Sequence, residues 1–371
     1  MDRTVSALGA LRRRWRWVAL LGVVALLAAL PGTIAGLPAR DRPLGAMGLL
    51  ERIRSSGSVA HTGVAESRAG LGLPDVPRAG RVVALFGETT RLRTWYGGPQ
   101  SWRVDELTPI GERDSYRDPA GMWLWDSGAR TATRIKGTSV VRFARPADLL
   151  PPELGRRLAA AAKPDEASRL PARRVAGVDA LGVRVEPHSK DTTIRRVDLW
   201  ADPDSGLPVR VEVTARGGAE PIVTSSFLDL EQEPPPRELL RFEPPADAAF
   251  NFTVAPDFAQ AVQRYSPFVL PEALAGRPRR SNVAAAAATY GRGYGLVGVL
   301  ALPERFSPED ELGGLPSIAG AWGQGHLVQT PLLNGLVFER EGVAYVLGGS
   351  VPPRLLKRFA THLAREGIRQ R

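Results

Sequence analysis

Residues 197–210 read VDLWADPDSGLPVR, and this stretch decides the fold. A strand that ends at Trp200 meets a turn of Asp, Pro, Ser and Gly, and a second strand opens at Leu207. Gly206 supplies the positive φ that the turn needs, so the stretch predicts a β-hairpin. The acidic residues are also spaced like part of a calcium loop, but two ligand positions would fall on Gly206 and Val213. We therefore expect a plain turn and no metal ion.

More strand-like runs lie on both sides of this hairpin. They are short, alternating and rich in aromatic residues, and glycine or proline separates them, as in antiparallel sheets. We expect strands at 81–86, 89–96, 101–107, 121–125, 129–135, 180–186, 195–200, 207–214 and 222–230. Residues 147–162 differ, because their leucines recur at helical spacing and predict a helix that interrupts the sheet. A short amphipathic helix is predicted at 44–55.

The proline-rich stretch 231–245 marks the end of a first domain. Beyond it we expect strands at 296–302, 335–339 and 343–347. A last helix is predicted to start at Ser350 as N-cap and to stop at Gly367, with an apolar stripe of Leu355, Leu356, Phe359, Ala360 and Leu363. A chain of 371 residues has room for about two domains. We expect an α+β protein with a membrane segment in 1–40, a sheet domain in 41–250 and a small α+β domain in 251–371.

The first 40 residues predict attachment to a membrane or export across it. The basic run Arg12-Arg13-Arg14-Trp15-Arg16 opens an uncharged stretch, and residues 15–37 would measure about 34 Å as a helix, enough to span a bilayer. Arginines at that end place the rest of the chain outside the cytoplasm, as a single-pass protein. The alternative is a signal peptide cleaved after Thr33-Ile34-Ala35, which would leave a secreted protein. The chain has no cysteine, so a lipid-modified cysteine cannot anchor it.

Charge and motif content argue against nucleic acid as a partner and against catalysis. The net charge of +10 is concentrated at the two chain ends, so the body between them is nearly neutral and lacks the basic face that duplex binding requires. The four histidines stand alone, without metal-binding spacing. Asp114 and Asp118 could form a carboxylate pair, but solvent-facing side chains beside a loop explain them better. We expect no catalytic set and no cofactor, and hence no enzyme.

Five of the eight tryptophans fall in the predicted sheet: Trp95, Trp102, Trp123, Trp125 and Trp200. Trp123 and Trp125 are two residues apart on one strand, so they share a face. The simple interpretation is an ordinary sheet core under a helix. The sharper hypothesis is a concave apolar face, lined by these tryptophans and closed by the helix at 147–162, that holds an acyl chain.

The hairpin at 197–210 resembles a hairpin of the LolA-like lipoprotein-carrier fold, and especially of its two-domain RseB type. The segment Phe242-Glu243-Pro244-Pro245 is similar to the closing element of that family, and residues 342–350 with the helix after them are similar to the small second domain of RseB-type proteins. The resemblance implies a curved antiparallel sheet closed by helices, which binds acyl chains or lipoproteins without catalysis. It also implies an alternative, a regulator that contacts an anti-sigma factor or an ABC transporter.

Overall fold

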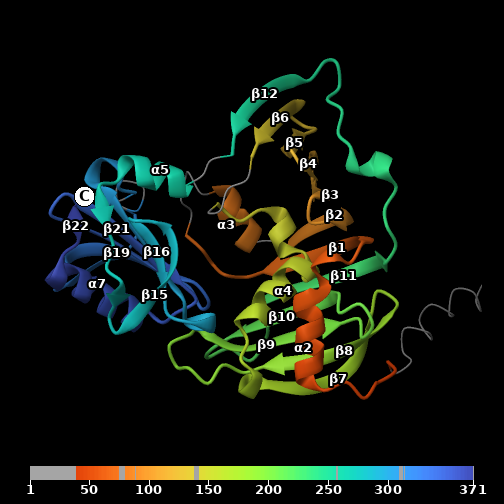
Figure 1. Cartoon of the computed structure of the whole chain (residues 1–371), viewed down its shortest axis with the longest axis horizontal. Helices are drawn as coiled ribbons and strands as arrows, with labels where there is room; N and C mark the ends of the chain where they lie inside the picture. The colour runs from red at the N-terminus through yellow and green to blue at the C-terminus, as the bar shows by residue number, and fades with distance from the viewer. Residues whose placement is uncertain are drawn as a thin grey trace, which may run out of the picture.

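The structure is a computed structural model that describes residues 39–74, 80–87, 89–137, 142–255, 258–308, 312 and 314–370. The predicted membrane segment at 15–37 lies outside these residues. Among the residues described, no helix combines the length and the apolar character needed to cross a bilayer. Mixed α and β structure with large, curved sheets confirms the predicted fold class in its coarser form (Figure 1).

The first sheet contains twelve strands. They are β1 (His61–Ala69), β2 (Thr89–Gly98), β3 (Ser101–Thr108), β4 (Gly111–Asp118), β5 (Gly121–Asp126), β6 (Thr131–Lys136), β7 (Ala167–Val175), β8 (Val178–Val185), β9 (Ile194–Ala201), β10 (Pro208–Ala215), β11 (Val223–Glu231) and β12 (Ala249–Val254). In space they run β12-β6-β5-β4-β3-β2-β1-β11-β10-β9-β8-β7. The predicted hairpin at 197–210 is confirmed as β9 and β10, which pair antiparallel.

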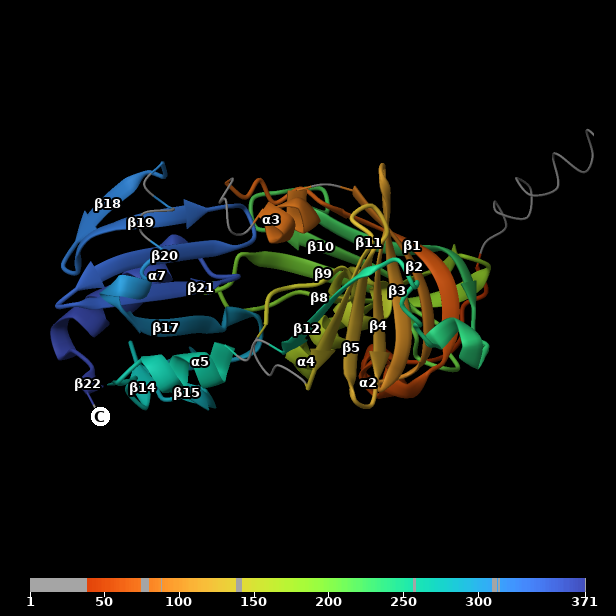
Figure 2. The ribbon, with the colours of Figure 1, turned by 90° about the horizontal axis from the view of Figure 1, so that it is seen from above.

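Three α-helices pack against this sheet: α2 (Ala46–Ser55), α3 (Gly80–Gly87) and α4 (Pro151–Ala161), the last preceded by the 3-10 helix η3 (Pro146–Leu149). Leu49, Leu50 and Ile53 of α2 are fully buried, which confirms its amphipathic pattern. A Cβ on Gly155 of α4 would lie 2.7 Å from Pro208, so glycine is what lets α4 approach β10 this closely. Figure 2 shows these helices beside the curled sheet.

The predicted strand at 81–86 is wrong, because these residues form α3. The five apolar residues 82–86 fit either the strand or the helix period, so packing decides between them. Leu85 is buried with Leu92 of β2 and Val104 of β3, which places α3 across those strands. We call the face of the sheet that carries α3 and α4 the inner face.

In the residues that the structure describes, the second domain contains an eight-stranded sheet together with the helices α5 (Phe258–Tyr265) and α7 (Pro353–Glu366). In spatial order its strands are β14 (Ala273–Leu274), β15 (Arg277–Ala284), β16 (Ala287–Tyr290), β17 (Val297–Pro303), β21 (Val343–Gly349), β20 (Asn334–Arg340), β19 (Gly323–Gln329) and β18 (Ser317–Gly320). A separate pair joins β13 (Phe268–Val269) to β22 (Arg369–Gln370). The predicted boundary at 250 falls inside β12, which extends the first sheet to Val254.

The last helix buries the apolar stripe predicted for it, since all five of its residues are at most 1% exposed. It ends at Gly367, whose φ of 67° lies in the left-handed region that glycine tolerates. The predicted N-cap is wrong: Pro352 occupies that position in place of Ser350. The Ser350 carbonyl is instead engaged by the first domain, because it accepts hydrogen bonds from the Thr193 main chain and the Thr192 hydroxyl, both at 2.9 Å.

Candidate functional site

Two hollows open on the inner face of the sheet, on strands β3 to β6. Side chains alternate between the two faces of a strand, so Trp102 shares the inner face with Val104, which packs under α3. The same alternation and the strand register place Leu124 of β5 and Thr133 of β6 on this face. The inner face therefore runs on past α3 toward the sheet edge.

The larger hollow has a volume of about 450 Å³ and lies between α3, the strands β3 to β6 and the segment before η3. Its apolar walls include Ala84 and Leu85 of α3, Leu124 of β5 and Pro146. Ser115 and Thr133 add hydroxyl groups to its floor. A volume of this size falls within the range of small-molecule pockets.

The smaller hollow, about 190 Å³, lies beside the larger one on the same face. Its apolar wall is made by Trp102, Met122, Ile135 and Ala255, and its polar wall by Arg117, Arg142 and Arg145. Arg145 lines both hollows and so marks the place where they meet.

Asp148 is the buried acid that organises this end of the site. Its carboxylate accepts two hydrogen bonds from Arg142, at 2.6 and 2.8 Å, and one from Arg157 at 2.6 Å. It also accepts one from the Arg145 main-chain N–H at 2.8 Å. Burial alone would raise the pKa of Asp148, but these guanidinium groups hold the pKa below its usual range.

The Arg145 guanidinium has no such carboxylate. Nη1 contacts the Met122 sulfur, and no ion pair within 4.0 Å joins Arg145 or Arg117 to an acid of the described chain. Burial, and next to it the neighbouring Arg142, lower the pKa of Arg145 to about 10. Neither arginine could be singled out in the sequence, because arginine is frequent along the whole chain.

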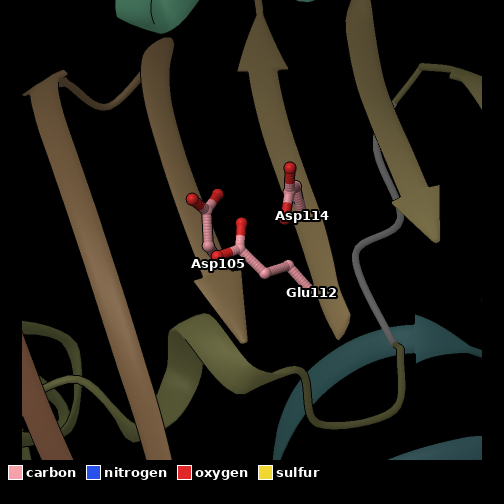
Figure 3. A group of neighbouring side chains, drawn as sticks. All are labelled: Asp105, Glu112 and Asp114. Carbon is pink, nitrogen blue, oxygen red and sulfur yellow. The ribbon is translucent and has the colours of Figure 1, made fainter. Parts of the chain in front are cut away.

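The opposite, outer face of β3 and β4 holds an acidic cluster of Asp105, Glu112 and Asp114 (Figure 3). One ligand atom from each lies within 4.8 Å of the others, a spacing that a metal ion could use. Arg103, however, donates to both Asp105 oxygens at 2.7 Å and approaches Asp114 at 3.4 Å. An ion would have to displace that guanidinium, so the chemistry of the cluster favours an internal ion pair.

The expectation that Asp114 faces solvent is wrong, because the residue is only 5% exposed. Burial, with the Asp105 carboxylate beside it, raises the pKa of Asp114 to about 7. Asp118 does lie beside a turn, where Arg134 donates to both of its oxygens at 2.7 and 3.0 Å. The two acids therefore do not act as a pair.

Phe242, in the segment that links β11 to β12, covers the outer face near this cluster. Its ring centroid lies 4.9 Å from that of Tyr116, 5.4 Å from Trp123 and 5.9 Å from Trp125. The predicted shared face of Trp123 and Trp125 is thus seen directly, since both rings contact one phenylalanine. The phenylalanine of the sequence motif at 242–245 serves to hold the linker on the sheet.

The structure separates the five tryptophans of the predicted cavity. Trp102 lines the smaller hollow, and Trp125 is among the residues that border the larger one. Trp95 lies on the outer face, where the Arg103 guanidinium stacks 4.6 Å from its ring. Trp200 is 8% exposed and donates to the Pro171 carbonyl at 3.2 Å. It lies on the face of β9 opposite Leu199, away from α4.

Among known proteins, solved structures are found that are similar to this chain. No family model matches the sequence, and no curated protein matches it. The chain is similar to MucB in complex with MucA(peri), with 17% identity over 88% of this chain and 98% of that one and a TM-score of 0.49. For MucB in the Pseudomonas aeruginosa MucA/MucB complex the identity is 16%, with the same coverage and TM-score.

A LolA superfamily protein from Nitrosomonas europaea is similar at 13% identity over 54% of this chain and 98% of that one, with a TM-score of 0.22. The similar structures thus include RseB-type and LolA-superfamily proteins, the groups that the sequence resemblance predicts. With identities of 17% or less and TM-scores below 0.5, the likeness does not assign a ligand or a partner.

Proposed function

We propose that this protein is an extracytoplasmic binding protein that holds an acyl chain, free or attached to a lipoprotein, and does no chemistry on it. The observation that carries the proposal is the larger hollow of about 450 Å³ on the inner face of the sheet. Leu85 and Leu124 give it apolar walls, and an acyl chain gains about 0.8 kcal/mol for each CH₂ that it buries. Charged residues, among them Glu106, Arg113 and Asp126, also line the hollow, so the apolar part of its wall is where we place the chain.

Membrane attachment belongs to the same proposal. The basic and uncharged pattern of residues 1–40 supports a retained single span that keeps the body near the membrane surface, where acyl ligands are found. N-terminal sequencing of the purified protein checks this: a start near Gly36 would replace the anchor by a cleaved signal peptide.

One tryptophan can report on the ligand. Trp102 lies on the inner face and borders the smaller hollow, so we propose that its emission changes when a chain enters. The rings of Trp95, Trp123, Trp125 and Trp200 contact other parts of the protein and supply a background signal.

A hollow-filling variant tests the binding site. The full chain, held in an amphipathic polymer, is titrated with an uncharged fluorescent acyl probe. Thr133→Phe places a ring in the larger hollow and should weaken binding at least about tenfold, which corresponds to about 1.4 kcal/mol. Thr89→Phe makes the same change at an exposed strand position and should leave the affinity within about twofold.

Equal affinities for both variants, or no binding by the unmodified chain, would remove the acyl-chain proposal. Circular dichroism melting curves must show that the Thr133→Phe protein is folded at the temperature of the titration, because an unfolded variant would also lose the probe.

A second candidate function is regulation through contact with a membrane protein, such as an anti-sigma factor or a transporter. The edge strand β12 favours it, because β12 pairs only with β6 in the described part of the chain. Its Phe250, Phe252 and Val254 are 57%, 60% and 66% exposed. Exposed apolar edge strands are suited to accept an extended segment of another protein.

Site-specific cross-linking in cells tests this contact. A photoreactive residue in place of Phe252 should trap one defined membrane protein, identified by mass spectrometry. The same residue in place of Leu228, which is 54% exposed on β11, serves as the matched control and should not trap it. Identical products from both positions, or none from Phe252, would contradict the contact.

A further inference from the structure

The smaller hollow is cationic on one side and apolar on the other. Arg117, Arg142 and Arg145 line it from β4 and from the segment before η3, and no acid is among the lining residues that the structure describes. Trp102 and Met122 belong to the apolar side. This arrangement suits a small anionic group that is joined to an apolar body.

Asp148, the acid that forms hydrogen bonds with Arg142 in the described chain, is already engaged. Both oxygens of Asp148 accept hydrogen bonds from Arg142, and one of them also accepts a hydrogen bond from Arg157. The negative charge of Asp148 is therefore shared between two guanidinium groups. Among the described residues, Arg117 donates to the Gln100 side-chain oxygen, at 3.3 Å. Three arginines and one carboxylate leave about two positive charges at the hollow.

An uncompensated guanidinium that is partly removed from water is costly, and proteins usually place a carboxylate beside it. Arg145 is half-buried and has the Met122 sulfur as its side-chain partner. An anionic oxygen in the hollow would give Arg145 the negatively charged partner that the described chain does not provide. It would accept short, charge-assisted hydrogen bonds from the planar guanidinium groups.

The position of Arg145 connects this charge to the proposed acyl site. Because Arg145 lines both hollows, a ligand whose anionic group meets Arg145 can extend its chain into the space beside Leu85 and Leu124. The two hollows together could therefore hold an amphiphile, with its anionic head group in the smaller hollow and its apolar chain in the larger one.

We infer that Arg117, Arg142 and Arg145 form a binding site for the phosphate or carboxylate head of an anionic amphiphile whose chain occupies the larger hollow. The inference rests on the proposed function, since it places the tail in the acyl site. The chemistry recognised is that of an oxyanion, which a single-chain lipid with a phosphate head supplies.

The experiment compares two amphiphiles that share one chain. The full chain, again held in an amphipathic polymer, is titrated with oleoyl lysophosphatidate and with monooleoylglycerol, which has the same chain but no charge. Inorganic phosphate is titrated alone in a third arm. The unmodified protein should bind lysophosphatidate at least about tenfold more tightly than monooleoylglycerol at low salt, as expected for hydrogen bonds between charged groups.

The double variant Arg117→Gln with Arg145→Gln should bring that affinity ratio close to one. Arg68→Gln is the matched control, because Arg68 is an exposed arginine of β1 with 70% of its side chain accessible. This control should keep the full ratio.

The outcomes separate the two proposals. If neither amphiphile binds, the proposed acyl site is contradicted, and so is the oxyanion site that rests on it. If both bind equally well, or if the double variant keeps the preference, only the oxyanion site is overturned. If inorganic phosphate binds as tightly as lysophosphatidate, the hollow takes free phosphate and the amphiphile is not its ligand.

Melting curves distinguish a ligand-binding arginine from one that only supports packing. Removing an uncompensated charge should not lower the melting temperature of the Arg145→Gln protein in the absence of ligand. Lysophosphatidate should raise the melting temperature of the unmodified chain and not that of the variant. A ligand-free variant that melts lower, with the affinity ratio intact, would assign Arg145 a structural role and overturn the site.

Discussion

At the scale of single residues, Asp114 carries a carboxyl group whose charged form is poorly supported. Its Oδ1 is buried and receives no hydrogen bond in the described structure, and its Oδ2 has only long contacts, 3.4 Å each, from Arg103 and Tyr116. Its pKa in the folded protein is about 7, above the ordinary value of 3.8. The folded state therefore binds a proton that the unfolded state has already lost, and stability falls as the pH rises from about 4 to about 7.

We predict that Asp114→Asn removes this pH dependence. The variant should gain stability relative to the unmodified protein as the pH rises: the difference between their free energies of unfolding should be at least about 1 kcal/mol larger, in favour of the variant, at pH 8 than at pH 5, because a pKa shift of one unit corresponds to about 1.4 kcal/mol. Denaturant unfolding at the two pH values measures it.

Asp118→Asn is the control for this prediction. The Arg134 hydrogen bonds lower the pKa of Asp118, so this carboxylate is charged in both folded and unfolded chains from pH 5 to pH 8. Its substitution should change stability by the same amount at both pH values. A parallel response of the two variants would show that Asp114 is not the titrating group.

At the scale of elements, the length of a periodic pattern decides how well it predicts structure. The helix α7 contains 14 residues with a clear apolar stripe, and its buried residues are the predicted ones. The helix α3 contains eight residues and an apolar run without a decisive period, so the strand prediction failed. The hairpin of β9 and β10 was predictable because its turn chemistry is local.

The candidate site was predictable only in part, because it depends on contacts between distant elements. Pairs two residues apart show which side chains share a face, as with Trp123 and Trp125. They do not show which face a helix will cover. The linker residue Phe242 occupies the face of those two tryptophans, whereas α3 lies over the other face. Arg145 is positioned by contacts with Asp148 of η3 and Met122 of β5, and these two elements lie far apart in the sequence.

At the scale of the whole molecule, the two domains share part of one core. Tyr294 and Leu332 come from the second domain, yet both pack in the hydrophobic cluster of the first, where they are 8% and 7% exposed. The Tyr294 hydroxyl donates to the Leu158 carbonyl of α4 at 2.7 Å. Because α4 follows directly on η3, this contact ties the second domain to the wall of the proposed ligand site.

We predict that the domains unfold as one cooperative unit and that Tyr294→Ala separates them. The variant loses a buried ring and a hydrogen bond at the contact, so we expect a cost of about 3 to 5 kcal/mol and a calorimetric trace that splits into two transitions. Tyr265→Ala removes the same side chain from a position that is 51% exposed in the same domain, and should keep a single transition with a change below about 0.5 kcal/mol. If the Tyr294→Ala protein still melts in one transition at the original temperature, the shared core contributes little to stability.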